Sequence, residues 1–177
     1  MATDDWGTLD FHNDDRRQLI ENIHLCAYKN LNNQGDENGR PPTNHWVIFL
    51  QLRDSVAKSV KVDMIPGDGA DGLAGTVILD SKEYVVTNAS IKTLTFKPTE
   101  PVTVQAIMDL IVKNKRDKYR FTEYEEGCRY WMYTLISDLE AGEILAQGSA
   151  TTAWASISLY WRDPSGSEPR MVERGTF

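Results

Sequence analysis

The hydrophobic pattern of the chain changes its period once, near Thr103. Before this residue, short apolar runs alternate with polar residues in the manner of β-strands. After it, apolar residues recur every three or four positions, which is typical of helices. Strands followed by helices predict an α+β fold: an antiparallel sheet of about five to six strands with about three helices packed against it.

The predicted strands are short runs separated by turn residues. Residues 45–52, HWVIFLQL, are apolar on both faces and predict a central strand. Residues 58–65, KSVKVDMI, alternate with Val60, Val62 and Met64 inward. The other predicted strands are residues 20–28, 75–80, 83–88 and 92–97, and for 20–28 the pattern leaves a helix open as the alternative.

Three segments have helical spacing. Thr103 is a suitable N-cap for a helix that the basic run 113–118 closes. The second predicted helix carries Cys128, Trp131, Leu135 and Leu139 on one face. The third lies within 149–161 and aligns Ala150, Ala153, Trp154, Ile157 and Trp161.

Domain organisation follows from charge and length. Acidic residues crowd the first fifteen positions, so we expect residues 1–17 to be a flexible acidic tail. Neither a repeat nor a linker divides the rest, and we expect residues 18–177 to form a single globular domain, long enough to bury a core.

The composition narrows the class of partner. The net charge is −7 and no basic stripe is present, which argues against nucleic acid and anionic membranes. No apolar run approaches the length of a membrane span, and the acidic start lacks the apolar segment of a secretion signal. We therefore expect a cytoplasmic protein that acts on a small molecule, and the sequence leaves a homodimer open. The two cysteines, Cys26 and Cys128, are expected to be free thiols.

Two patterns that would imply a cofactor or a metal fail on inspection. Residues 67–72 read GDGADG and match the spacing of a dinucleotide fingerprint, but their two aspartates would repel a phosphate and a strand follows. We interpret them as a loop between strands and expect no cofactor. The three histidines have no companion ligands at metal-binding spacing, so we expect no metal.

Cys128 and His45 are the first candidates for catalysis. Cys128 follows a glycine at a predicted helix start, where a thiolate is favoured, and a histidine on a central strand could act as its base. This N-H-W strand followed by a G-C-x-x-W helix start resembles circularly permuted papain-like proteins, which include the NlpC-type peptidases and the lecithin retinol acyltransferase group. The resemblance implies that His45 is the base and Cys128 the nucleophile.

Other readings of the same residues stay open. Glu125 and Glu126 stand beside the thiol, and neighbouring carboxylates disfavour its ionisation. A cysteine on an apolar helix face is also a common core residue, and His45 is open to the same reading. Cys128 is thus a nucleophile, a pocket wall or core.

The aromatic residues suggest a second chemistry. Tryptophans on the predicted helix faces make core, but aromatic walls with a few polar groups also form pockets for flat apolar ligands. In such a pocket Asp63, Glu125 or Glu126 would act as a general acid and His45 as a base. The candidate substrate-binding residues are Trp46, Arg129, Trp131, Trp154, Tyr160 and Trp161.

Several segments together resemble an uncharacterised fungal domain family. They are His45-Trp46, the turn from Asp63 to Gly67, and Glu126-Gly127-Cys128-Arg129-Tyr130-Trp131. The resemblance implies a filamentous-fungal origin and a link to natural-product gene clusters. Small proteins of that setting close rings without a cofactor, for example by adding a hydroxyl across an olefin.

Three hypotheses follow from the sequence. The first is a cofactor-independent enzyme that closes or isomerises an apolar or aromatic small molecule by acid–base chemistry. The second is a cysteine–histidine hydrolase or acyltransferase of the permuted papain-like type. The third is a non-catalytic small-molecule binding module. The sequence gives neither the substrate nor the contact between His45 and Cys128.

Overall fold

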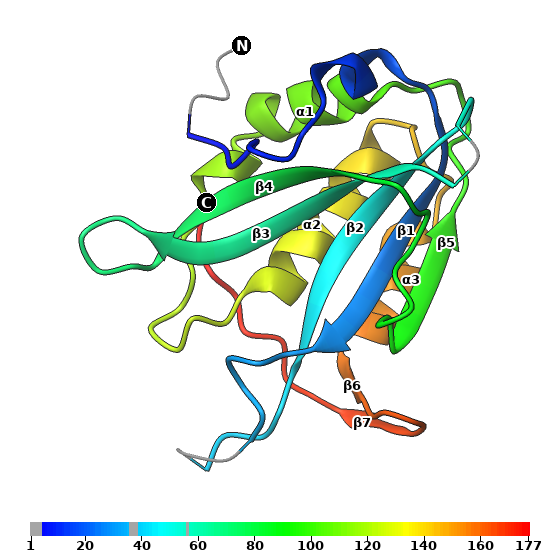
Figure 1. Cartoon of the computed structure of the whole chain (residues 1–177). Coiled ribbons are helices and arrows are strands. Elements are labelled where there is room, and N and C mark those ends of the chain that lie inside the picture. Colours follow the sequence, from blue (N-terminus) through cyan, green and yellow to red (C-terminus); the bar gives the residue numbers. More distant parts are fainter. Residues whose placement is uncertain (1–4, 36–38, 56) are drawn as a thin grey trace.

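The computed structural model describes residues 5–35, 39–55 and 57–177. Its main element is a five-stranded antiparallel sheet in the order β4-β3-β2-β1-β5 (Figure 1). The strands are β1 (Ile20–Lys29), β2 (Asn44–Leu52), β3 (Ser59–Asp68), β4 (Ala74–Lys82) and β5 (Lys92–Phe96). β1 to β4 form a meander, and β5 returns to pair with the free edge of β1.

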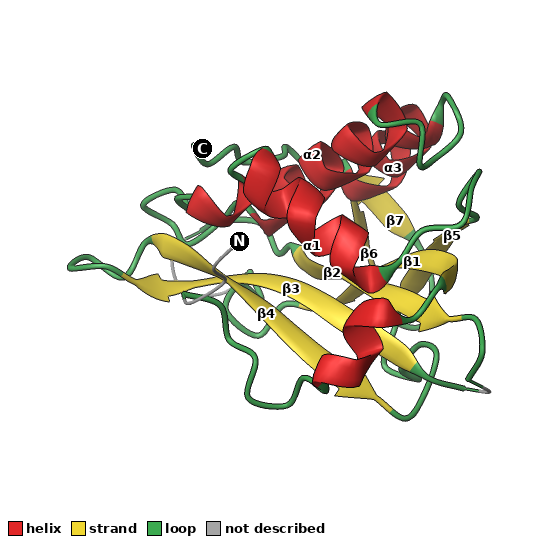
Figure 2. Cartoon of the chain, turned by 90° about the horizontal axis from the view of Figure 1, so that it is seen from above, coloured by secondary structure: helices red, strands yellow, loops and turns green. Residues whose placement is uncertain are grey.

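The helices cover one face of this sheet (Figure 2). They are α1 (Val104–Lys113), α2 (Cys128–Ala141) and α3 (Ser149–Ile157), with short 3-10 turns at Asn13–Arg17 and Arg116–Lys118. The Thr103 hydroxyl caps α1 by accepting from the Ala106 amide at 3.2 Å. A small hairpin, β6 (Leu159–Trp161) and β7 (Ser167–Pro169), follows α3. The predicted α+β class is confirmed.

Both faces of the central strand are buried, as its apolar run predicts. Ile48 and Leu50 belong to the main core between sheet and helices. Val47 and Phe49 point to the other face, where they form a smaller cluster with Cys26. Because a strand that is buried on both faces cannot alternate in polarity, its sequence reads as a continuous apolar run.

Two predicted elements differ from the structure. The predicted strand 83–88 is irregular: Val86 instead packs on the smaller cluster, and the Tyr84 carbonyl accepts from the Ser59 hydroxyl at 2.6 Å. β-branched residues favour a strand, but here they cover the sheet instead of extending it. The third helix ends at Ile157, and the apolar residues after it form β6.

Residues 5–17 pack on the sheet, unlike the acidic tail that we expected for residues 1–17. Trp6 and Phe11 are buried, and the Gly7 amide donates to the Val77 carbonyl of β4 at 2.9 Å. The two aromatic rings hold the segment, and the Asp15 carboxylate accepts from the Ser81 hydroxyl of β4 at 2.5 Å. Residues 1–4 lie outside the described part. Within the described ranges, no helix combines the length and apolar character needed to cross a membrane.

Candidate functional site

A pocket opens where β2 and β3 separate. The last paired residues of the two strands are Ile48 and Val62, although β2 begins earlier, at Asn44, and β3 continues to Asp68. The helix α2 packs on both strands, and its first residue, Cys128, lines the pocket. The pocket measures about 430 Å³, within the usual size of small-molecule sites.

Four of the five predicted catalytic residues line this pocket. They come from separate parts of the chain: His45 from β2, Glu125 and Glu126 from the loop before α2, and Cys128 from α2 itself. The remaining walls are the end of β1, the hairpin between β3 and β4, and Phe121. The structure thus brings together His45 and Cys128, a contact that the sequence could not give.

The fifth candidate, Asp63 of β3, contacts His45 directly. Its Oδ1 lies 2.8 Å from Nε2 of His45, and the two side chains are only 10 % and 25 % exposed. The other carboxylate oxygen, Oδ2, lies 3.4 Å from the Lys61 ammonium, which also lies 3.3 Å from Asp80. Because Nε2 is engaged with Asp63, Nδ1 is the ring nitrogen left for the thiol proton.

The pKa values of His45 and Asp63 are shifted by their neighbours in opposite directions. Burial alone would lower the pKa of His45, but the charge and hydrogen bond of Cys128, together with Asp63, raise that pKa well above 6.5. Burial would raise the pKa of Asp63, but the hydrogen bond and charge of His45, helped by Lys61, hold it below 3.8. The arrangement therefore favours a charged imidazolium of His45 beside the charged carboxylate of Asp63.

The position of Cys128 at the first turn of α2 adds a second source of positive potential. The amides of Cys128, Arg129 and Tyr130 find no acceptor among the described residues, and the first helical bond runs from Trp131 to Gly127. Unpaired amides and the helix dipole favour an anion at this end. The same amides can receive the oxygen charge that develops when a thiolate attacks a carbonyl.

Tyr119 supports the start of α2 and was missed by sequence reasoning. Its buried hydroxyl donates to the Gly127 carbonyl at 3.0 Å and accepts from the Gly175 amide at 2.8 Å. Gly127, the residue before Cys128, is thereby tied to the C-terminal segment. A tyrosine after a run of charged residues carries no sequence signal for such a role.

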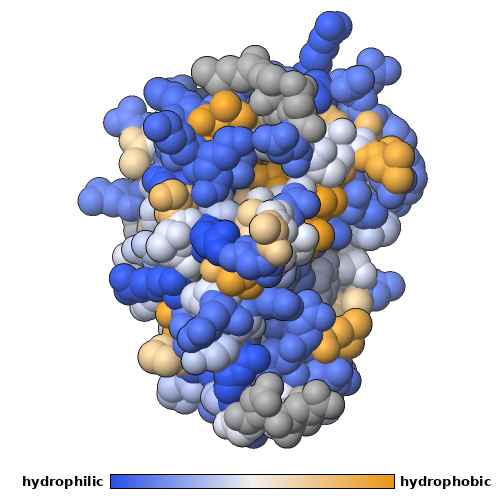
Figure 3. All heavy atoms as spheres, turned by 90° about the vertical axis from the view of Figure 1, so that its left-hand side faces the viewer, coloured by the Kyte–Doolittle hydropathy of each residue, from blue (hydrophilic) through white to orange (hydrophobic). Residues whose placement is uncertain are grey.

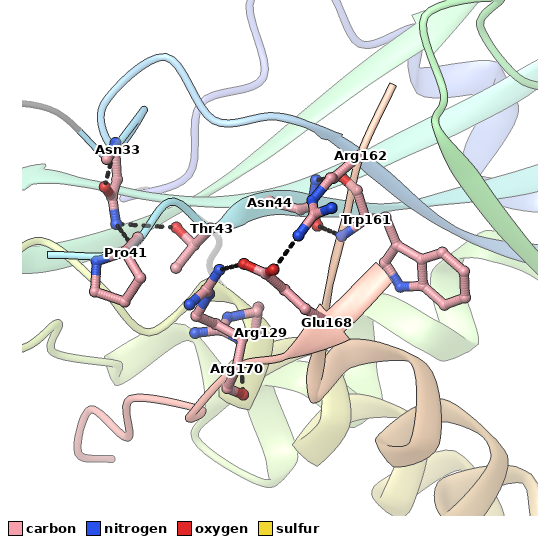
Figure 4. A network of polar contacts seen from close by, with 10 residues as sticks. Asn33, Pro41, Thr43, Asn44, Arg129, Trp161, Arg162, Glu168 and Arg170 are labelled. Atoms are coloured by element: carbon pink, nitrogen blue, oxygen red, sulfur yellow. Dashed lines mark hydrogen bonds and ion pairs between the residues drawn. The ribbon is translucent and has the colours of Figure 1, made fainter. Parts of the chain in front are cut away.

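The two neighbouring glutamates have different surroundings. Glu126 is buried, and its Oε1 accepts from the Thr43 hydroxyl at 2.8 Å and from the Asn33 amide at 2.9 Å. Asn33 and Thr43 also contact each other in the loop between β1 and β2 (Figure 4). Glu126 therefore fastens that loop beside the pocket. Glu125 is exposed and has a positive φ of 55°.

Three of the predicted substrate-binding residues are buried away from the pocket. Trp46 lies in the core, and Trp131 donates its indole N–H to the Arg116 carbonyl at 2.7 Å. The Arg129 guanidinium donates to the carbonyls of Ile157, Arg170 and Met171. These side chains hold α2 against its neighbours.

Of the other three, Tyr160 and Trp161 belong to β6 of the small hairpin, and Trp154 lies on α3. Trp161 exchanges two hydrogen bonds between its backbone and the Asn44 side chain, at 2.7 and 3.0 Å (Figure 4). The ring of Tyr160 lies beneath the Arg170 guanidinium. Trp154 packs edge-on against Tyr133. The structure does not gather these aromatic residues around the pocket of His45 and Cys128.

No three histidine, cysteine or acidic side chains among the described residues gather in a way that could hold a metal ion.

Comparison of the sequence with known proteins identifies the family to which the chain belongs. Residues 23–177 match the family described as "Domain of unknown function (DUF7770)". No curated protein and no solved structure matches the chain.

Proposed function

The chain belongs to the DUF7770 family, and we propose that it is a thiol-dependent hydrolase or acyltransferase with Cys128 as nucleophile and His45 as base. The observation that carries the proposal is the meeting of a helix-start thiol and an imidazole at one pocket, with a carboxylate bound to the far nitrogen of the imidazole. Such a trio activates a nucleophile because the base takes the thiol proton and the carboxylate orients the base.

The proposed reaction has two steps. The Cys128 thiolate attacks the carbonyl carbon of an ester or amide, and the negative oxygen lies at the free amides of α2. The carbon–leaving-group bond breaks while the His45 imidazolium gives its proton to the leaving group. Water or another acceptor then attacks the thioester, His45 takes the acceptor's proton, and the carbon–sulfur bond breaks to restore the thiolate.

Asp63 and Lys61 are assigned supporting roles. Asp63 binds Nε2 of His45, so Nδ1 is the nitrogen that exchanges the proton with Cys128 and with the leaving group in this proposal. Lys61 lies against the second oxygen of the same carboxylate, which favours its charged form. Neither residue touches the substrate in this proposal.

Acid–base ring closure is the less favoured function. It requires a carboxylic acid that keeps its proton, but the pKa of Asp63 is lowered and its Oδ1 faces His45. Glu126 is bound to two donors, and Glu125 is exposed to water. Fungal origin, a biosynthetic gene cluster, a cytoplasmic location and a non-catalytic binding role stay predictions.

Thiol alkylation tests the proposal, because the chain contains an internal reference. Cys26 is fully buried, and burial raises its pKa, so it should react slowly with iodoacetamide. We expect Cys128 to be labelled first near neutral pH, and the His45→Ala variant to slow its labelling about tenfold or more, since the imidazolium no longer stabilises the thiolate. Peptide mapping by mass spectrometry gives both rates.

Turnover completes the test. Hydrolysis of an activated ester should be lost in Cys128→Ser and reduced about a hundredfold in His45→Ala, the usual contribution of a general base. The Cys26→Ser variant should keep its activity. A Cys128 that reacts no faster than Cys26, and is indifferent to His45, would overturn the proposal and leave Cys128 as core.

A further inference from the structure

The order of the strands divides the pocket into two sides. His45 lies on β2, which stands between β3 and β1 in the sheet. The β3 side of the pocket is apolar: Met64, Ile65 and Pro66 come from the strand, and Phe121 lies beside them. A substrate that reaches Cys128 therefore meets an apolar wall on this side of the imidazole.

The β1 side has a different character. Three polar residues, Lys29, Asn30 and Asn32, line this side together with Tyr28 and the exposed Leu31. Lys29 is exposed to solvent, so its ammonium is available to a polar group of a ligand. The two sides of His45 thus suit chemically different halves of one molecule.

The apolar wall is incompletely covered by protein. Phe121 and Met64 are buried, but Ile65 is 36 % exposed beside them at the pocket. Figure 3 views the molecule from the side of the β3–β4 hairpin and shows separate hydrophobic patches among hydrophilic residues. Covering an exposed apolar side chain at a pocket with an apolar ligand group removes both surfaces from water, which is favourable.

We propose, on the basis of the thiol chemistry proposed above, that the substrate is an ester or amide with an apolar acyl chain and a polar leaving group. The acyl chain lies along Ile65 and Phe121 on the β3 side, and the leaving group departs on the β1 side. The specificity-determining residue for the acyl chain is Ile65, because it is both exposed and in the wall.

A series of p-nitrophenyl esters with acetyl, butanoyl, hexanoyl and octanoyl groups tests this substrate class on the full chain. The leaving group stays constant, so differences in kcat/KM report on the acyl side. Each methylene that becomes buried should raise kcat/KM about fourfold, the factor equivalent to its transfer from water. Intact-protein mass spectrometry identifies the acyl group on the protein, and Cys128→Ser gives the background.

Two substitutions distinguish an effect of the apolar wall on substrate preference from an effect of any change at the protein surface. Ile65→Ser should lower the octanoyl-to-acetyl ratio of kcat/KM about fourfold or more, because the chain loses an apolar neighbour. Leu9 is 98 % exposed and is not among the residues that line the pocket, so Leu9→Ser is the matched control and should leave the ratio unchanged.

The outcomes distinguish this inference from the function on which it rests. A kcat/KM that rises with chain length and depends on Ile65 supports an apolar acyl substrate. Cys128-dependent hydrolysis with a flat or falling series overturns the acyl inference and leaves thiol catalysis standing. If no ester acylates Cys128, the proposed function itself fails, and the acyl inference fails with it.

Discussion

At the scale of single residues, the contact between His45 and Asp63 determines how the site responds to pH. The pKa of His45 is raised above 6.5 and that of Asp63 is lowered below 3.8. A group whose pKa is raised on folding stabilises the protein fully at pH values below its ordinary pKa. This stabilisation is lost as the pH rises through the pKa of the group in the folded protein. A group whose pKa is lowered on folding stabilises the protein at pH values above its ordinary pKa. This stabilisation is lost as the pH falls through the pKa of the group in the folded protein. The pair therefore contributes most between pH 3.8 and 6.5.

Asp63→Asn should consequently destabilise the protein in a pH-dependent manner. We expect a loss of about 1–3 kcal/mol near pH 5.5, the usual value of a hydrogen bond to a charged group. The loss should shrink as the pH rises and His45 gives up its proton in the wild type. Urea unfolding of both proteins from pH 5 to pH 9 measures the difference.

Asp80→Asn is the control for this prediction. Asp80 also contacts Lys61, at 3.3 Å, but it has no contact with a histidine among the described residues. Its effect on stability should stay nearly constant over the same range. A pH dependence shared by both variants would contradict the assignment to His45.

The adjacent glutamates offer a second comparison of single residues. Glu126→Ala removes a buried acceptor from Asn33 and Thr43, so we expect a loss of about 1–3 kcal/mol in the free energy of unfolding. Glu125→Ala changes an exposed side chain and should cost less than about 0.5 kcal/mol. Chemical denaturation at neutral pH distinguishes them, and equal losses would contradict the loop-fastening role of Glu126.

Sequence alone could reach part of this site. Cys128 and His45 stood out because their element types suit a nucleophile and a base. Asp63 was also chosen, but as an acid, since its partner depends on where β2 and β3 stop pairing. Strand register is fixed by packing across the sheet, and no local pattern encodes it. For the tryptophans the sequence left core and pocket wall both open, because a helix face packed on the core and a ligand wall have the same apolar pattern.

At the scale of elements, the start of α2 is held in one geometry by a glycine. Gly127 has a φ of 147°, and a Cβ there would lie 2.7 Å from the Tyr119 hydroxyl. Gly148 caps α3 with a φ of 93°, but a Cβ there would meet nothing within 4 Å. The two N-cap glycines share a positive φ that is unfavourable for other residues. They differ in the room that a Cβ atom would have.

Alanine at these two positions should therefore have unequal effects. Gly148→Ala costs only the backbone strain of a positive φ, about 1–3 kcal/mol. Gly127→Ala adds the clash with Tyr119, so we expect a larger loss of stability and slower alkylation of Cys128. Thermal unfolding and iodoacetamide labelling give both quantities. An equal loss in the two variants, with labelling unchanged, would show that Tyr119 moves aside freely.

The elements themselves were largely predictable, and the misses have a physical pattern. The continuous apolar run 45–52 and the periodic helix after Thr103 formed as expected. The segment 83–88 has strand-forming residues but forms no strand. The strand β4 before it ends at Lys82, and the free edge of β1 on the far side of the sheet is paired with β5. The apolar side chains of the segment are used to cover the sheet. Local propensity gives way to tertiary packing in such segments.

At the scale of the whole molecule, the C-terminal segment joins distant parts around α2. Arg129 is buried, and its guanidinium reaches the carbonyls of Arg170 and Met171 in that segment. Thr176 pairs with Arg120 through two backbone bonds of 2.8 and 2.9 Å. The last residues of the chain are thus fastened to the helix that begins with Cys128, so their loss should affect both stability and the site.

Removing the guanidinium tests this connection. Arg129→Met keeps much of the apolar stem but removes the donor to the buried Ile157 carbonyl and to the partly buried carbonyls of Arg170 and Met171. We expect a loss of about 2–5 kcal/mol in the free energy of unfolding. Hydrogen exchange should become faster in residues 170–177, because the segment loses its attachment. Arg174 is exposed, and its guanidinium lies over the rings of Tyr130 and Trp154, so Arg174→Met should cost less than about 1 kcal/mol. If exchange in 170–177 stayed at the wild-type rate in Arg129→Met, the segment would be held by its backbone pairing with Arg120 instead.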